Sequence, residues 1–138
     1  MILFIDDEYR RVKPYIEELE LSGYQVEFKD NLDDALNFWE ERKQEINLIV
    51  LDIMMPIGNN FDESAQQEAE CGLKTGIYFY NKYLKSKDTP VILFTHLSDV
   101  NIPDNEDNQF FLFKKLDYLP YEFVQKVTAI LKQNCYLK

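Results

Sequence analysis

The 138-residue chain contains few of the residues that build disulfide frameworks, glycine-rich loops or histidine metal sites. Its two cysteines, Cys71 and Cys135, form no CxxC pair or framework pattern, so we expect a reduced, cytoplasmic setting. It has four glycines, and no glycine-rich loop follows any apolar run, which argues against a nucleotide-binding Rossmann domain. His96 is the only histidine, and we interpret it as a loop residue rather than a metal ligand.

Basic residues are also scarce. Fifteen Lys and Arg against 25 Asp and Glu give a net charge of −10, which argues against binding to nucleic acid or to an anionic membrane. We interpret most of this acidity as favouring solubility. No apolar run approaches the length of a membrane span. The first residues, MILFIDDE, lack the basic segment of a secretory signal and are typical of a core strand.

Hydrophobic residues are plentiful and follow two periods. They make up 46% of the chain, with ten Phe and nine Tyr, as in a globular protein. Short apolar or alternating runs predict strands at 2–5, 24–28, 46–51, 91–94 and 110–113. Apolar stripes of helical spacing lie at 12–19, 32–39, 73–84 and 124–131. This alternation predicts one α/β domain, residues 1–138, with a parallel sheet between two helical layers.

Two segments depart from the alternation. Residues 57–72 contain no Lys or Arg and form a long acidic connection, with a short helix expected around Ser64 to Glu70. Residues 97–108 lie where a fourth helix belongs, but they are rich in Asn and Asp and lack an apolar stripe. We therefore expect a loop or one short turn there, so that the fourth helix is short or missing.

Charged and hydroxyl side chains follow the strands of the predicted sheet. They are Asp6, Asp7 and Glu8 after the first strand, Asp52 after the third, Thr95 after the fourth, and Lys114 and Lys115 after the fifth. Ligands of parallel α/β sheets bind beyond the carboxyl ends of the strands. Close carboxylates repel one another, and a hard cation such as Mg²⁺, which prefers oxygen ligands, relieves that repulsion. An aspartate at this edge could accept a phosphoryl group, held by a lysine and a threonine.

Four segments in order, ILFIDDE, LIVLDIMMP, VILFT and FFLFK, give the chain its resemblance to the response-regulator receiver domains of bacterial two-component signalling. The resemblance covers most of the 138 residues. It implies a flavodoxin-like, doubly wound sheet of five parallel strands in the order 2-1-3-4-5.

The resemblance also implies a role for each acidic residue. Asp52 corresponds to the phosphoacceptor of these domains. Asp7 would bind Mg²⁺ directly and Asp6 through water, and the backbone carbonyl of Met54 would be a further ligand. A haloacid-dehalogenase phosphatase would need a second aspartate two residues after Asp52, where this chain has Met54.

Thr95 and one lysine would hold the phosphoryl group. We choose Lys114 over Lys115, because the family carries an aromatic switch residue three positions before its lysine and Phe111 stands there. Thr95 and Phe111 would then form the switch. Lys115 replaces the proline that usually follows the lysine across a cis bond, and His96 replaces a small residue.

The resemblance predicts a signalling domain and no enzyme, beyond self-catalysed phosphoryl transfer and loss of the phosphoryl group. A histidine kinase or phosphotransfer protein would phosphorylate Asp52, and an unknown downstream protein would read the result through contacts. The alternative is a receiver-like interaction module that works without phosphorylation.

Overall fold

The computed structural model describes residues 1–56, 61–69, 74–84, 88–96 and 110–137, with side chains placed up to residue 133. Five parallel strands form one sheet in the order β2-β1-β3-β4-β5. Their bounds are β1 Ile2–Ile5, β2 Val26–Lys29, β3 Leu48–Leu51, β4 Val91–Thr95 and β5 Phe110–Lys114. The fold class and the strand order predicted from the sequence are confirmed.

Burial of the strands follows their apolar content. Every residue of β1, β3 and β4 is buried, because these central strands are covered by helices on both faces and carry continuous apolar runs. The edge strands β2 and β5 are only partly buried and include charged residues.

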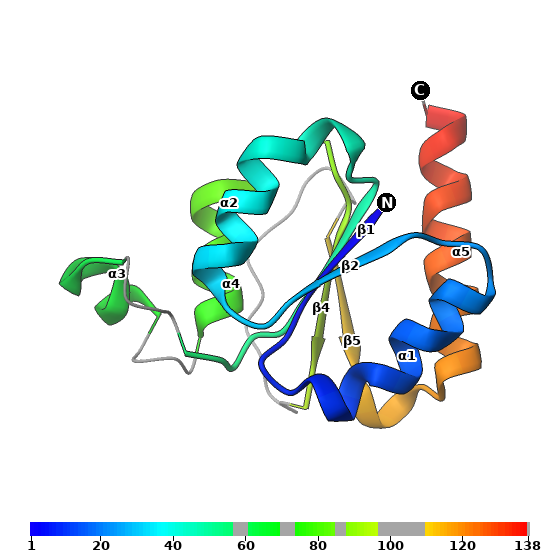
Figure 1. Ribbon diagram of the computed structural model, residues 1–138, viewed down its shortest axis with the longest axis horizontal. Coiled ribbons are helices and arrows are strands. Elements are labelled where there is room, and N and C mark those ends of the chain that lie inside the picture. The colour runs from blue at the N-terminus through cyan, green and yellow to red at the C-terminus, as the bar shows by residue number, and fades with distance from the viewer. Residues whose placement is uncertain (57–60, 70–73, 85–87, 97–109, 138) are drawn as a thin grey trace.

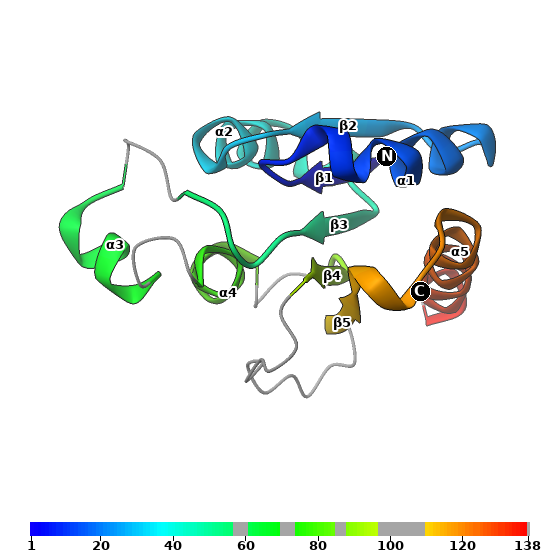
Figure 2. The same ribbon diagram turned by 90° about the horizontal axis from the view of Figure 1, so that it is seen from below.

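The helices form a layer on each face of the sheet. α1 (Tyr9–Leu21) and α5 (Pro120–Leu137) cover one face, and α2 (Leu32–Arg42) and α4 (Thr75–Phe79) cover the other (Figures 1 and 2). α4 continues as a π-helical turn, Tyr80–Leu84, and short 3-10 turns follow α2 at Lys43–Glu45 and β5 at Lys115–Asp117. Asn31 caps α2, since its side chain accepts a hydrogen bond from the Asp34 amide at 2.8 Å.

The core is divided by the sheet into two clusters. One joins Ile2, Phe4 and Phe94 to α1 and α5, with Phe94 and Phe123 stacked at 4.5 Å between ring centroids. The other joins Leu3, Leu51 and Leu93 to α2 and α4. Two packed layers of this kind fix where each strand ends, and so fix the edge that carries the charged residues.

The acidic connection after β3 contains α3, Glu63–Glu68, close to the short helix expected there. Asp62 caps it by accepting a hydrogen bond from the Ala65 amide at 2.8 Å. α3 lies outside the two helical layers, at the far side of α4 from the sheet (Figure 2). Residues 97–108 lie outside the described part of the chain, so the prediction of a short or missing fourth helix stays a prediction, as does the single domain over 1–138. Within the described residues, no helix is both long and apolar enough to cross a membrane.

Candidate functional site

Three carboxylates meet at the carboxyl edge of the sheet, as the sequence predicted. Asp6 follows β1, Asp7 follows Asp6, and Asp52 follows β3; each offers a carboxylate oxygen within 4.8 Å of the others. Asp6 and Asp52 are buried and Asp7 is exposed. Strands β1 and β3 are direct neighbours, and their last residues, Ile5 and Leu51, are paired. The residues that follow these two strands therefore lie side by side.

Backbone groups hold two of these carboxylates in place. Asp6 Oδ1 accepts a hydrogen bond from the Glu8 amide at 2.9 Å, and Asp52 Oδ1 accepts one from the Ile53 amide at 2.9 Å. The amide of Asp52 in turn donates to the Ile5 carbonyl at 3.0 Å. Each aspartate is therefore oriented by the turn that leaves its own strand.

Lys115, and not Lys114, is the lysine that enters this cluster. Its Nζ lies 2.7 Å from Asp6 Oδ2 and 3.8 Å from Asp52 Oδ1, and its side chain is 5% exposed. Lys114, the last residue of β5, is exposed. The cluster therefore contains Lys115, whereas Lys114 was chosen from its spacing along an extended strand; which of the two lysines binds a phosphoryl group stays a prediction.

Lys115 reaches the acidic cluster because a turn begins at this residue, directly after β5. Lys115 starts the 3-10 turn Lys115–Asp117, and its ammonium lies 5.9 Å from the centre of the Phe94 ring. The Tyr15 hydroxyl of α1 shares its one hydrogen between the carbonyls of Tyr118 at 2.7 Å and Lys115 at 3.3 Å, and so ties this turn to α1. All peptide bonds in the described residues are trans, including the bond between Lys114 and Lys115.

The position of Lys115 in the cluster also bears on the choice of the switch residue. Leu112 stands three positions before Lys115, and it packs against the cluster on the α2 and α4 face. Phe111 packs on the opposite face, beside α1 and α5, with its ring 6.3 Å from that of Phe113. Counted from Lys115, the same spacing would select Leu112, so the switch role of Phe111 stays a prediction.

Thr95, His96 and Met54 lie at the same edge. Thr95 ends β4, is 1% exposed and is in register with Lys114 of β5. His96 is exposed to solvent. The part of its imidazole that is buried, and the positive charges of Lys115 and Arg11, lower its pKa. The Met54 side chain is 47% exposed in the turn after Asp52.

Electrostatic crowding is strongest at Asp52. Burial raises the pKa of its carboxyl to about 7, and the neighbouring Asp6 adds to the rise, while Lys115 opposes it. Burial and then Asp6 also raise the pKa of Asp7. The single ammonium of Lys115 thus leaves the cluster short of positive charge.

A hard divalent cation fits this donor set. Three carboxylates of one cluster supply only oxygen ligands, and Asp7 remains accessible from solvent. Asp6, Asp7 and Asp52 are the residues that would hold such an ion. A bound cation would stabilise the ionised forms of Asp52 and Asp7, whose pKa values are raised by burial and by neighbouring carboxylates.

Sequence reasoning missed the contacts that hold the turn after Asp52. The Gly76 amide of α4 donates to the Ile53 carbonyl at 2.9 Å, and the Thr75 hydroxyl donates to the Met55 carbonyl. A Cβ on Gly76 would lie 2.1 Å from the Asp52 carbonyl oxygen, so only glycine fits. A glycine inside a helical pattern signals such close packing, and Gly76 was the available signal.

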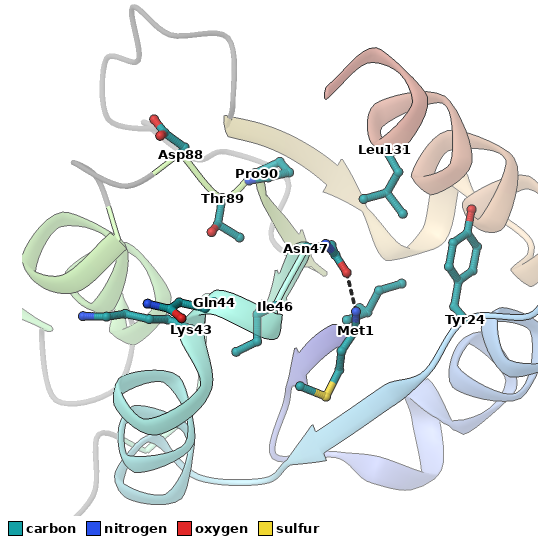
Figure 3. Close-up of a pocket in the computed structure, with 11 residues that line it drawn as sticks. Met1, Tyr24, Lys43, Gln44, Ile46, Asn47, Asp88, Thr89, Pro90 and Leu131 are labelled. Atoms are coloured by element: carbon teal, nitrogen blue, oxygen red, sulfur yellow. Dashed lines mark hydrogen bonds between the residues drawn. The ribbon is translucent and has the colours of Figure 1, made fainter. Parts of the chain in front are cut away.

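A separate cavity of about 400 Å³ opens at the opposite, amino-terminal edge of the sheet. Met1, Tyr24 and Leu131 are among its lining residues (Figure 3). None of its lining residues belongs to the acidic cluster, so the chemistry at Asp52 has no counterpart there.

The strand order and the two helical layers are those of the receiver fold, which several solved structures share. The chain resembles a CheY-like response-regulator receiver domain from Methanospirillum hungatei JF-1, with 16% identity, TM-score 0.62, and coverage of 99% of this chain and 97% of that one. It also resembles the signal receiver domain of a Luxo repressor protein from Vibrio parahaemolyticus (18% identity, TM-score 0.65, coverage 98% and 92%).

A response-regulator receiver domain from Clostridium thermocellum is similar to the same degree, with 18% identity, TM-score 0.65, and coverage of 99% and 98%. No protein-family model matches the sequence, and no curated protein matches it. The chain has the receiver-domain fold, at a sequence identity low enough that its function must be argued from its own residues.

Proposed function

We propose that this protein is a phosphoacceptor domain in two-component signal transduction, phosphorylated on Asp52 by a histidine kinase or a phosphotransfer protein. One observation carries the proposal: Asp6, Asp7, Asp52 and Lys115 come together at the carboxyl edge of a receiver fold. A structural role alone does not require three carboxylates around one ammonium, because close like charges destabilise the fold.

Asp52 is the nucleophile. One carboxylate oxygen attacks the phosphorus of the donor's phosphohistidine, a P–O bond forms, and the P–N bond breaks with its electron pair returning to the imidazole. Water later attacks the same phosphorus, which releases inorganic phosphate and restores the carboxylate. The buried backbone bond from the Ile53 amide holds the Asp52 carboxylate in one orientation for the attack.

Asp6, Asp7 and Asp52, with the carbonyl of Met54, would hold Mg²⁺, which supplies positive charge to the oxygens of the transferring phosphoryl group when bound. Lys115 supplies an ammonium 3.8 Å from Asp52 Oδ1. Thr95 would contribute its hydroxyl to a phosphoryl oxygen. We assign the phosphoryl-binding role to Lys115 in place of Lys114.

The partner must cover the mouth of the site in order to deliver its phosphoryl group. Five of the six exposed large hydrophobic residues in the described chain follow the carboxyl ends of β1, β3 and β5. Met54, Leu116 and Leu119 lie in connections, and Tyr9 and Tyr121 lie in the first turns of α1 and α5. An apolar rim around a charged centre suits a protein donor, since it can be buried on contact. We place the protein in the cytoplasm, as a signalling module whose downstream partner reads the phosphorylated state.

Intact-mass measurement tests the proposal. Wild type incubated with acetyl phosphate and Mg²⁺ should gain one phosphoryl group, and Asp52→Asn should gain none. Asp62→Asn, which changes the cap of α3, should behave as wild type and serves as the matched control. A gain in mass by Asp52→Asn, or none by wild type, rejects Asp52 as the acceptor.

The alternative is a receiver-like module that works without phosphorylation. The direct Lys115–Asp6 pair favours it, because an internal ammonium 2.7 Å from the buried carboxylate partly neutralises the cluster without an ion. Partner capture that is equal for wild type and Asp52→Asn, together with no phosphoryl gain by wild type, would support this second reading.

A further inference from the structure

We infer that Thr75 is a positioning residue for the site, because its hydroxyl and the Gly76 amide clamp the turn after Asp52 onto α4. The consequence of this inference rests on the proposed function, and its geometry rests on two hydrogen bonds of the structure. The clamp consists of two hydrogen bonds: Gly76 amide to Ile53 carbonyl at 2.9 Å, and Thr75 hydroxyl to Met55 carbonyl.

The two bonds fix the peptide group between Ile53 and Met54 and the one between Met55 and Pro56. Ile53 and Met55 both turn their carbonyls toward α4, so Met54 stands between two anchored residues. Ile53 is tied on its other side as well, since its amide donates to Asp52 Oδ1 at 2.9 Å. The orientation of the Met54 carbonyl and of the Asp52 carboxylate is therefore set through α4.

Burial makes the clamp rigid. Thr75 is fully buried, Met55 is 3% exposed, and Gly76 lies so close to the Asp52 backbone that a Cβ would meet its carbonyl at 2.1 Å. A hydroxyl lost from such a place leaves a buried carbonyl without its donor, and water cannot easily replace it. The turn would then be free to adopt other orientations.

The clamp also closes the base of the acidic connection. The chain leaves the turn after Met55 and returns to it at Thr75, with α3 between them. Residues that support a metal ligand from behind commonly change metal affinity or activity by about 10- to 100-fold when they are altered. Thr75 contacts the carbonyl of Met55, the residue after Met54, and so supports the Met54 carbonyl indirectly.

Thr75→Val tests the inference, because it removes the hydroxyl and keeps a branched side chain. Thr75→Ser keeps the hydroxyl and should restore the wild-type behaviour. Thr128→Val is the matched control: it removes another threonine hydroxyl, the partner of the Tyr24 hydroxyl at 2.8 Å, on α5. All three are compared with wild type at a temperature at which each is folded.

Two measurements follow the clamp directly. Amide hydrogen exchange without Mg²⁺ should show the Gly76 amide exchanging at least about 10-fold faster in Thr75→Val than in wild type or Thr128→Val. Amide NMR titration with Mg²⁺ alone should show a half-saturating concentration about 10-fold higher in Thr75→Val, with wild-type values in Thr75→Ser and Thr128→Val.

The outcomes separate the two proposals. A half-saturating Mg²⁺ concentration in Thr75→Val within twofold of wild type, or a wild type that binds no Mg²⁺, overturns the positioning role. A wild type that binds Mg²⁺ but gains no phosphoryl group from acetyl phosphate overturns the proposed function alone. A merely structural role would lower thermal stability in Thr75→Val without moving the Mg²⁺ half-point.

Discussion

Replacing Asp52 by Asn should stabilise the protein, and the gain should grow with pH. Asp52 is buried beside Asp6, which raises its pKa from 3.8 to about 7, so the folded protein binds its proton more tightly than the unfolded chain does. Stability from that proton is complete below the unfolded pKa and is lost as pH rises through about 7. Asparagine carries no charge and can still accept the bond from the Ile53 amide.

The size of the effect follows from the difference between the two pKa values. Full ionisation of Asp52 in the folded state costs about 4 kcal/mol relative to the unfolded chain, and roughly a third of this is already lost at pH 5. The free energy of unfolding of Asp52→Asn should therefore exceed that of wild type by about 3 kcal/mol more at pH 8 than at pH 5. The pKa of about 7 already includes the opposing attraction of the Asp52 carboxylate to Lys115.

Urea unfolding in EDTA at four pH values between 5 and 8 measures this difference, with equal slopes required for the comparison. Glu20→Gln, which removes an exposed carboxylate of α1, is the control and should give a flat offset. When EDTA is replaced by Mg²⁺ at about 100 times its Kd, the free energy of unfolding of wild type at pH 8 should rise by about 2.7 kcal/mol. The difference in free energy of unfolding between Asp52→Asn and wild type should then become smaller. Parallel curves for wild type and Asp52→Asn across the whole range would show that the charge on Asp52 is not crowded, and would refute the reasoning.

Three further changes test other parts of the structure. Lys115→Ala should lower the free energy of unfolding by about 3 kcal/mol or more, because it leaves the buried Asp6 carboxylate without its ion-pair partner. Lys114→Ala should change the free energy of unfolding by less than about 0.5 kcal/mol. Equal losses for the two variants in urea unfolding would contradict the assignment of Lys115 to the site. Gly76→Ala should destabilise by about 3 kcal/mol through overlap with the Asp52 carbonyl, while Gly23→Ala, at φ 97° with open space around it, should cost about 1 kcal/mol and leave phosphorylation unchanged; a milder effect at Gly76 would mean that α4 can move. Leu119→Ser on the apolar rim should slow phosphorylation by a phosphotransfer protein at least tenfold relative to wild type and leave phosphorylation by acetyl phosphate unchanged. If Leu119→Ser and wild type are phosphorylated at the same rate by the phosphotransfer protein, the rim is not part of the docking surface.

Local sequence patterns determined the order of strands and helices and the identity of the acidic cluster. Continuous apolar runs at β1, β3 and β4 specify buried parallel strands, and a parallel sheet brings the residues after neighbouring strands to one edge. Asp6, Asp7 and Asp52 could therefore be placed together from the sequence, without knowledge of any distance. The pattern needs only the period of the side chains and the direction of the strands.

Tertiary structure alone decided which lysine completes the cluster and what holds the turn after Asp52. Lys114 and Lys115 differ by one position, and which of them faces inward depends on where β5 ends and the 3-10 turn begins, a point fixed by the Tyr15 hydroxyl from α1, 100 residues earlier in the chain. The clamp from Thr75 to Met55 likewise joins residues 20 positions apart across the acidic connection. Contacts between elements so distant in sequence leave no periodic signal, so only the packed structure could reveal them.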